Sequence, residues 1–321
     1  MAYRVDPDAP LDAEFRRIAG EQLRKAERAL GATERDRNEA IHDARKRLKA
    51  LRGLLRLVRD AKPAFHAREN VRYRDLARSL SGARDAGALV EALDQLAAHY
   101  AEEVAADVFR RAREQLVERR DTTPVEEIDP AMETLVGSLG AARHELDGFV
   151  IGPKNKAGDA AQIVARGFAR TQARGRAAWA VAQKRRDVES FHELRKRAKY
   201  HWMHLKLLGP LWPEVMAPQA TAAKAIADGL GLDHDYAVMR QEIARTPDTF
   251  GTQRELAVLL ALVDRRQTEL REAALGTARR LFADDPDGVA TRIKRLYRAA
   301  QMARDPGVPV ASPLDVLRRA S

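Results

Sequence analysis

The stretch "IHDARKRLKALRGLLRLV" at residues 41–58 decides the fold, because a second copy of it occurs later in the chain. It aligns without gaps with "FHELRKRAKYHWMHLKLL" at residues 191–208, and the two copies are 150 positions apart. Both copies read His-x-x-Arg-Lys-x-x-Lys and carry apolar residues at helical spacing. Like charges on one helix repel each other, so this face is either solvated or opposed by a strongly anionic group.

The offset of 150 residues persists outside the two copies. It also pairs "LSGARD" at residues 80–85 with "LGLDHD" at residues 230–235. Ala, Leu, Arg and Glu dominate throughout, and no stretch alternates apolar and polar residues for long enough to predict a strand. The most loop-like interior segment is "DGFVIGPKNKAGD" at residues 147–159. We therefore predict an all-α, internally duplicated chain whose halves are bundles of about four helices.

Composition limits the partners. The chain has 321 residues and a formal net charge of +10, which favours polyanions such as nucleic acid or phosphate polymers. It contains no cysteine, which excludes disulfides and thiolate metal sites. Neither a signal-peptide core nor an apolar run of about 20 residues is present, so we expect no membrane span and a cytoplasmic location.

The basic residues of the first copy share one side of the predicted helix. On a wheel of about 100° per residue with His42 at zero, the basic arc runs from roughly −80° to +40°. Its members are Arg45, Lys46, Lys49, Arg52 and Arg56, and the second half repeats the arc with Arg185, His192, Arg195, Lys196, Lys199 and Lys206. Solvated faces usually mix charges of both signs, whereas the first arc contains no acid. This pattern favours a function for the arc.

These residues resemble the CHAD family, the conserved histidine α-helical domain. The resemblance rests on the doubled His-x-x-Arg-Lys-x-x-Lys motif, on "GARD" at 82–85 and on "LGLDHD" at 230–235, and it spans roughly residues 7–305. It implies two pseudo-symmetric four-helix bundles, at 1–150 and 151–305, that together form one CHAD domain with a basic central groove or pore. Residues 306–321 would be a tail. The resemblance also implies binding of inorganic polyphosphate and location at polyphosphate granules.

The basic arcs supply the expected polyphosphate ligands. The residues that we expect to contact polyphosphate are His42, Arg45, Lys46, Lys49, Arg52, Arg56, His192, Arg195, Lys196, Lys199 and Lys206, with Arg35, Arg185, Arg74 and Lys224 as a second tier. Arg47 and Arg197 are repeated too, but they fall near roughly 140° on the wheel and are left out. Cationic neighbours should keep both histidines mostly neutral near neutral pH, so affinity should rise modestly toward about pH 6. Phosphate or sulfate are further candidate anions.

Two other functions compete with this interpretation. RNA would also suit a basic groove, but single-strand binders add stacking aromatics, and only Trp202 falls on either arc. A metal-dependent phosphohydrolase could use "HD" at 42–43 or 234–235, yet Asp85 and Asp235 are more simply read as helix caps. His201 lies on the apolar stripe, which favours burial over zinc binding. We therefore predict a binding protein that is not an enzyme and needs no metal or cofactor.

Overall fold

The described part of the chain consists of helices joined by loops, as predicted. The computed structural model describes residues 3–32, 37–80, 85–122, 128–151 and 157–302, and these ranges contain no strand. The first half of the sequence forms α1 (Leu11–Gly31), α2 (Arg37–Leu57), α3 (Pro63–Ser79), α4 (Asp85–His99), α5 (Asp107–Thr122) and α6 (Ile128–Asp147). The second half forms α7 (Ala157–Arg185), α8 (Val188–Leu207), the short 3₁₀ turn η2 (Gly209–Leu211), α9 (Pro213–Arg245), α10 (Pro247–Phe250), α11 (Gln253–Leu281) and α12 (Pro286–Met302). None of the helices in these ranges has an apolar stretch that could cross a bilayer.

Local signals in the sequence explain where several of these helices begin. Asp187 precedes α8, and its carboxylate accepts a hydrogen bond from the backbone N–H of Ser190 at 2.8 Å. α11 begins with a capping box between Thr252 and Glu255. α9 begins with Pro213, at a position where a helix has no use for the missing N–H. The starts of three long helices are therefore set by neighbouring residues.

The helix boundaries follow the sequence repeat, with one exception. α2 ends at Leu57 and α8 ends at Leu207, one repeat later. α9, however, runs without a break through the positions that correspond to the end of α3, the following loop and the start of α4. The prediction that Asp235 caps a helix was therefore wrong, because this residue lies inside α9. One reason is that α9 has Leu232 where the first half has Gly82, and leucine favours helix far more than glycine.

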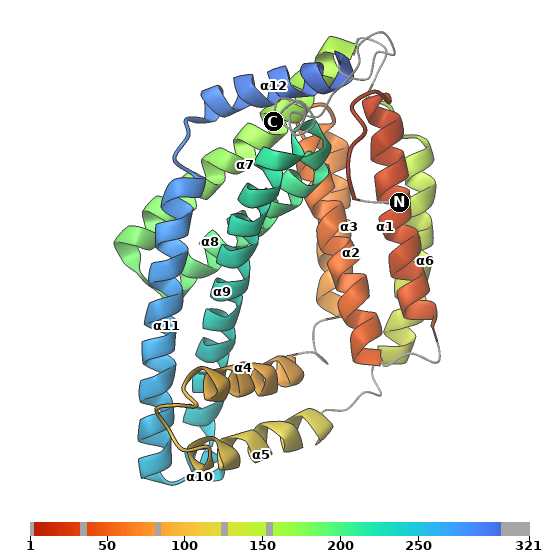
Figure 1. Ribbon diagram of the computed structural model, residues 1–321. Helices are drawn as coiled ribbons and strands as arrows, with labels where there is room; N and C mark the ends of the chain where they lie inside the picture. The colour runs from red at the N-terminus through yellow and green to blue at the C-terminus, as the bar shows by residue number, and fades with distance from the viewer. Residues whose placement is uncertain (1–2, 33–36, 81–84, 123–127, 152–156, 303–321) are drawn as a thin grey trace, which may run out of the picture.

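Helices from the first half of the sequence pack on helices from the second half. The apolar faces of α4 and α5 share a core with α9 and α11, which contains Leu93, Phe109, Tyr236 and Val263. Figure 1 shows α4 and α5 lying across the lower ends of α9 and α11. A larger core joins α1, α2, α3 and α6 to parts of α7, α8 and α12, including Tyr297. The packing thus crosses the boundary that we predicted near residue 150.

α2 and α8 approach each other closely at a glycine. A Cβ atom at Gly53 would lie 2.8 Å from the Met203 sulfur and 3.1 Å from the Tyr3 hydroxyl, so this position has no room for a side chain. The Nε2–H of His204 donates a hydrogen bond to the Gly53 carbonyl at 3.0 Å. These contacts fix the distance between the two helices that carry the repeated basic motif.

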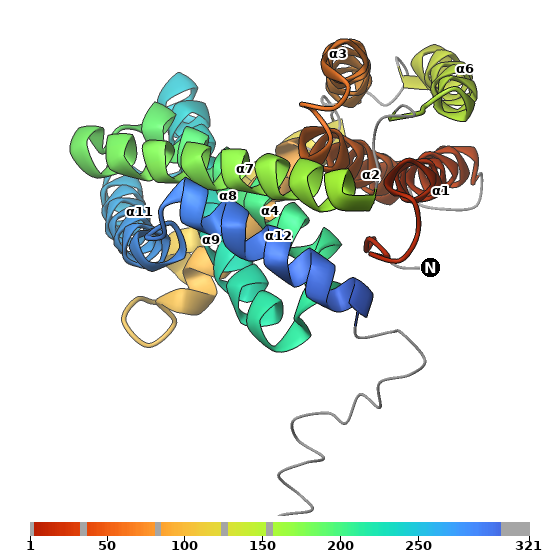
Figure 2. The same cartoon turned by 90° about the horizontal axis from the view of Figure 1, so that it is seen from above.

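A second glycine lets α7 approach α2. A Cβ atom at Gly167 would lie 2.1 Å from the carbonyl oxygen of Leu57, a backbone atom that cannot move aside. Seen from above in Figure 2, α7 spans the molecule from α11 to α2, with α12 beside it. α2 is therefore held against both α7 and α8, and this arrangement determines which of its side chains face each neighbour.

Candidate anion-binding cavity

A cavity of about 680 Å³ lies between α2, α8 and α9, with further contributions from the N-terminal segment, α1 and α4. Its described lining contains seven Lys or Arg side chains and two carboxylates, so the cavity carries a net positive charge. The basic lining residues are His42, Lys46, Arg47, Lys49, Arg195, Lys199, Lys206 and Lys224. One row comes from the first repeat and the other from the second, so the fold brings matched parts of the repeat into one space.

Helical spacing aims the α2 row at the cavity. His42, Lys46 and Lys49 are four and three residues apart and therefore share one face of the helix. The opposite stripe, which includes Ile41 and Leu48, is buried in the core at 1% and 0% exposure. The apolar stripe fixes the rotation of α2, and that rotation turns these three side chains toward α8.

α8 presents its own basic face to the same space. Arg195, Lys199 and Lys206 line the cavity together with Trp202 and Met203, at the spacing of one helix face. The Lys206 ammonium lies 5.0 Å from the centre of the Trp202 ring, in a cation–π contact. This indole therefore already has a cation at one face.

The pKa of Lys206 reflects the positive charges that surround it. Its pKa is lowered, first by burial and then by the positive charges of Lys46, Arg4 and Arg47. Lys46 belongs to α2 and Lys206 to α8, so the two rows repel each other across the cavity. The two lining carboxylates offset only part of this charge, and one of them, Asp228, is already ion-paired with Lys224.

Arg47 also lines the cavity, although the helical wheel had placed it outside the basic arc. Its effect on the pKa of Lys206 confirms that its charge is felt there. A wheel describes where a Cβ atom points, whereas a long arginine side chain reaches around the helix. The repetition of arginine at this position in both copies was the one sequence signal that could have retained it.

Three predicted ligands on α2 contact α3. The guanidinium of Arg45 donates to the carbonyls of Ala77 and Leu80 at 3.1 and 2.8 Å, at the carboxyl end of α3. Arg52 and Arg56 both donate to the side-chain oxygen of Asn70 at 3.2 Å. The structure therefore turns Arg45 and Arg52 toward α3 and places Arg56 beside both α3 and Tyr200 of α8, and none of the three lines the cavity.

Other predicted residues also lie away from the cavity lining. Lys196 pairs with Glu193, Arg185 pairs with Asp187 at 2.7 Å, and Arg74 pairs with Asp75 at 2.8 Å. Of the second-tier residues that the structure describes, Lys224 alone lines the cavity. Arg35 lies outside the described residues.

His192 faces His234 of α9, with the ring centres 5.2 Å apart, and does not line the cavity. Its pKa is lowered, first by burial, then by His234, and then by Arg195 and Lys196. The direction agrees with the expectation from its cationic neighbours, but burial is the larger cause. The predicted pH dependence of binding through a lining histidine therefore rests on His42.

His201 and His204, the two histidines of "HWMH" at residues 201–204, are buried in the core. His201 is 1% exposed and packs against Phe168 and Phe282, with ring centres 5.0 and 5.2 Å away. Burial lowers the pKa of His201 to about 3, and burial lowers that of His204 to about 4. This confirms the expectation that His201 is buried. Within the described ranges, no three His, Asp or Glu side chains gather as a set of metal ligands.

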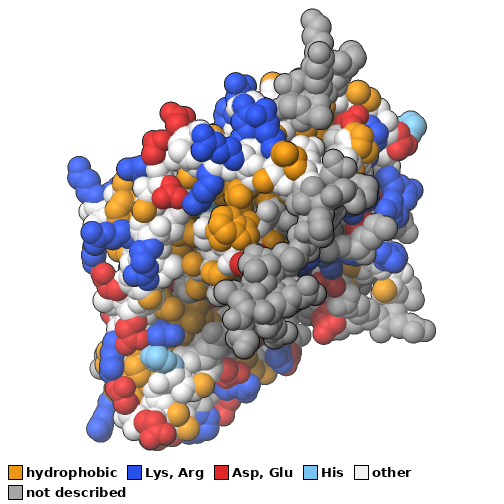
Figure 3. Space-filling model, turned by 45° about the horizontal axis from the view of Figure 1, so that its top comes forward, with side chains coloured by type: hydrophobic (Ala, Val, Ile, Leu, Met, Phe, Trp, Pro, Cys, Tyr) orange, Lys and Arg blue, Asp and Glu red, His pale blue; other side chains and the backbone are white. Residues whose placement is uncertain are grey.

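The face of the molecule in Figure 3 differs from the cavity, because it mixes charges of both signs. On the face that Figure 3 shows, the described Lys and Arg side chains lie among Asp and Glu and among exposed hydrophobic side chains. Such mixing is typical of a solvated surface, where pairs of opposite sign stabilise helices. The excess of positive charge in the cavity is therefore the feature that indicates a function.

Comparisons with known proteins place the fold. The family model described as the CHAD domain matches residues 17–244. The crystal structure of the CHAD domain from the plant Ricinus communis is similar to this chain, with a TM-score of 0.60 and 20% sequence identity. That similarity covers 88% of this chain and 95% of the plant chain, and at this identity it supports the fold alone. A search of curated proteins finds no match.

Proposed function

Because this chain belongs to the CHAD domain family, we propose that it binds inorganic polyphosphate, without catalysis, in the cavity between α2, α8 and α9. The observation that carries the proposal is the composition of the lining. Six Lys or Arg side chains from the two copies of the repeated stretch, together with Lys224, line a single cavity whose described lining has two carboxylates. A densely charged polyanion would neutralise this excess.

The energetics favour a polymer over a single phosphate ion. An exposed ion pair contributes only about 0–1 kcal/mol, so one lysine holds a phosphate weakly. A polymer that meets many cations adds these contributions and loses its translational entropy once. Arg47 and Arg195 can each hold phosphate oxygens with two parallel hydrogen bonds, while the lysines act as point charges.

RNA is the main competing ligand, and the lining argues against it. Proteins that bind single strands stack bases on aromatic rings. Trp202 is the one indole in the described lining, and the ammonium of Lys206 already lies over its ring. A ligand that has phosphates and no bases needs only the cations that the cavity supplies.

A titration with polyphosphates of defined length, at two salt concentrations, tests the proposal. We expect affinity to rise with chain length and to fall steeply with salt, and we expect RNA at equal phosphate concentration to leave bound polyphosphate in place. Displacement of long-chain polyphosphate by RNA would instead favour a nucleic-acid-binding protein.

Incubation of polyphosphate with the protein tests the second part of the proposal, which is binding without catalysis. We expect chain length on a gel to stay constant with Mg²⁺, with Mn²⁺ and with a chelator. Shortening that depends on a metal ion would show phosphohydrolase activity.

Binding of this kind would also bring the protein to polyphosphate granules in the cytoplasm. A fluorescent fusion should colocalise with granules, and the double variant Lys49→Gln/Lys199→Gln should be diffuse. Equal recruitment of both proteins would mean that another surface directs the protein there.

A further inference from the structure

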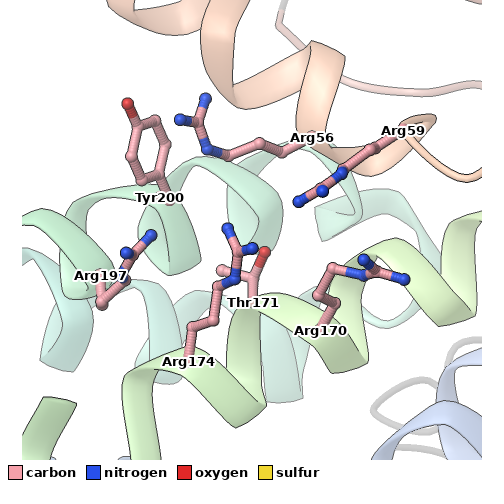
Figure 4. A pocket seen from close by; sticks show the side chains of 7 residues that line it. All are labelled: Arg56, Arg59, Arg170, Thr171, Arg174, Arg197 and Tyr200. Carbon is pink, nitrogen blue, oxygen red and sulfur yellow. The ribbon is translucent and has the colours of Figure 1, made fainter. Parts of the chain in front are cut away.

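A second concentration of positive charge lies where α2, α7 and α8 meet. Five arginines surround a small pocket whose other lining residues are Thr171 and Tyr200, as Figure 4 shows. The arginines are Arg56 and Arg59 from the end of α2 and just beyond it, Arg170 and Arg174 from α7, and Arg197 from α8. We call this group the arginine pocket.

The arginine pocket is distinct from the central cavity. Among the described residues, none lines both. On α8, Arg197 and Tyr200 point to the pocket, whereas Arg195 and Lys199 line the cavity. The same two helices therefore present separate basic groups on different faces, and the pocket is independent of the function proposed above.

The carboxylates near the pocket neutralise only part of its charge. Asp60 accepts a hydrogen bond from Arg170 at 2.8 Å, and Glu193 pairs with Arg197. Within the described ranges, Arg59 and Arg174 form no hydrogen bond and no ion pair. Arg59 and Arg174 therefore line the pocket without an ion-paired carboxylate, and Glu193 acts on Arg174 only through its charge, which raises the pKa of Arg174.

Arg56 is bonded to neutral partners only. Its guanidinium donates to the Arg52 carbonyl at 2.7 Å and to the Asn70 side chain at 3.2 Å, and it lies 3.8 Å from the centre of the Tyr200 ring. Its buried Nε–H has no acceptor. A buried charge without an anionic partner lowers the stability of a fold, and the charge of Arg56 lies in the lining of this pocket.

The arginines also depress one another's basicity, which shows that the fold holds them against mutual repulsion. The pKa of Arg56 is lowered to about 10, mainly by burial and then by the charges of Arg52, Arg197 and Arg174. Burial also lowers the pKa of Arg174, and Arg197 and Arg59 lower it further. An anion placed among these groups would relieve the repulsion.

We propose that the arginine pocket is a second anion site that binds one compact, multiply charged phosphate group. Guanidinium groups match phosphate oxygens through paired hydrogen bonds, and arginine is the residue that such recognition favours. The pocket has about 10 Å³ of interior space, which is about the room that one water molecule needs. A polymer therefore cannot thread through it. The ligand is either free phosphate or pyrophosphate, or the terminal group of a phosphate chain. Each is larger than a water molecule, so it would lie across the mouth of the pocket and direct its oxygens at the guanidinium groups.

The double variant Arg59→Gln/Arg174→Gln tests this site in the full-length protein. Neither residue neutralises a carboxylate, so their removal leaves no acid unpaired. In buffer without phosphate, the melting temperature should rise, because two repelling charges are lost. With pyrophosphate added, the wild-type protein should gain stability, and the double variant should bind pyrophosphate at least tenfold more weakly by calorimetry. The charge-matched control Lys184→Gln/Arg295→Gln, on exposed residues outside both sites, should behave as wild type.

The conservative variant Arg174→Lys provides a second readout, since it keeps the charge and removes the paired hydrogen bonds. We expect weaker pyrophosphate binding at an unchanged melting temperature. Pyrophosphate affinity that stays at the wild-type value in both arginine variants would overturn the proposal.

Chains of defined length then distinguish the two phosphate sources. Weaker binding of pyrophosphate alone assigns the pocket to free phosphate, whereas weaker binding of short polyphosphates as well assigns it to chain ends. The central cavity is tested separately through Lys49 and Lys199, so one proposal can fail without the other.

Discussion

Arg45 and Lys49 are one helical turn apart on α2, yet their side chains contact different parts of the molecule. Arg45 donates to carbonyls at the end of α3, and Lys49 lines the central cavity. A helical wheel places both on the same basic arc, because it records direction and does not record which helix lies nearby. The sequence could therefore predict the basic face, but it could not divide that face between structural and cavity-lining roles.

The role of Arg45 leads to a prediction about stability. Arg45→Gln removes charge-assisted hydrogen bonds to Ala77 and Leu80 and should lower the free energy of unfolding by about 2 kcal/mol. Urea denaturation measures the loss, and polyphosphate affinity should change little. The exposed Lys46, replaced by Gln, is the control for lost charge, and its stability should stay near wild type. Full stability with lost binding in the Arg45 variant would return this residue to the ligand set.

The buried histidines make stability depend on pH. His201 and His204 have pKa values of about 3 and about 4 in the folded protein, against about 6.5 in an unfolded chain. Below about pH 6.5 the unfolded state binds protons that the folded state excludes, so stability falls as pH falls toward about 4. The expected loss is up to about 1.4 kcal/mol per pH unit for each histidine.

Urea denaturation at about pH 7 and about pH 5 measures this loss. His201→Leu should flatten the dependence, because His201 Nδ1 is buried without a partner and the substitution leaves no acceptor unsatisfied there. His144→Gln, at a side chain that is 91% exposed, serves as the control. Identical slopes in the Leu variant and the wild type would show that His201 is not the titrating group.

At the scale of elements, the sequence predicted α2 and α8 well, because their apolar stripes and helix breaks are local patterns. The α2 stripe that contains Leu48 is buried as expected, whereas the cap that Asp187 provides for α8 was not predicted. The unbroken α9 was not predicted. A single glycine such as Gly231, which lies inside α9, is a weak break signal on its own, and the packing of a whole helix overrides single propensities.

The close contacts of α2 predict the effect of adding a methyl group. Gly167→Ala should cost more stability than Gly53→Ala, since the first clashes with the Leu57 backbone and the second with the flexible Met203 side chain. Overpacking of this kind costs about 1–3 kcal/mol. Gly137→Ala, at an exposed helical position with open space around it, should instead stabilise α6 by roughly 0.5–1 kcal/mol. Thermal denaturation of the three variants gives the order, and a reversed order would contradict this account of helix contact.

At the scale of the molecule, the sequence could not predict which helices pack against each other. The apolar face of α4, with Leu89, Leu93 and Leu96, could cover any apolar surface, and the structure uses it to cover α9 and α11. The sequence repeat suggested two self-contained halves. Periodicity identifies the face of a helix that is buried, but it does not identify the helices that pack against that face.

Because α4 and α5 pack on α9 and α11, we predict that the first half of the chain needs the second half to fold completely. A fragment of residues 1–150 should leave α4 and α5 unprotected in amide hydrogen exchange, because Phe109 and Leu116 lose their partners on α9 and α11. In the full-length chain the same amides should be protected. Equal protection in fragment and full chain would show that α4 and α5 fold within the first half.

The central claim is that two matched basic rows act together on one polyanion, and the salt dependence of polyphosphate affinity measures this directly. The logarithm of the binding constant should fall linearly with the logarithm of salt concentration for the wild type. In Lys49→Gln/Lys199→Gln, which removes one cation from each row, the slope should be shallower by about 2, from about 1 per lost contact. The charge-matched control Lys184→Gln/Arg295→Gln should keep the wild-type slope. A slope that does not change in the cavity variant would contradict the account.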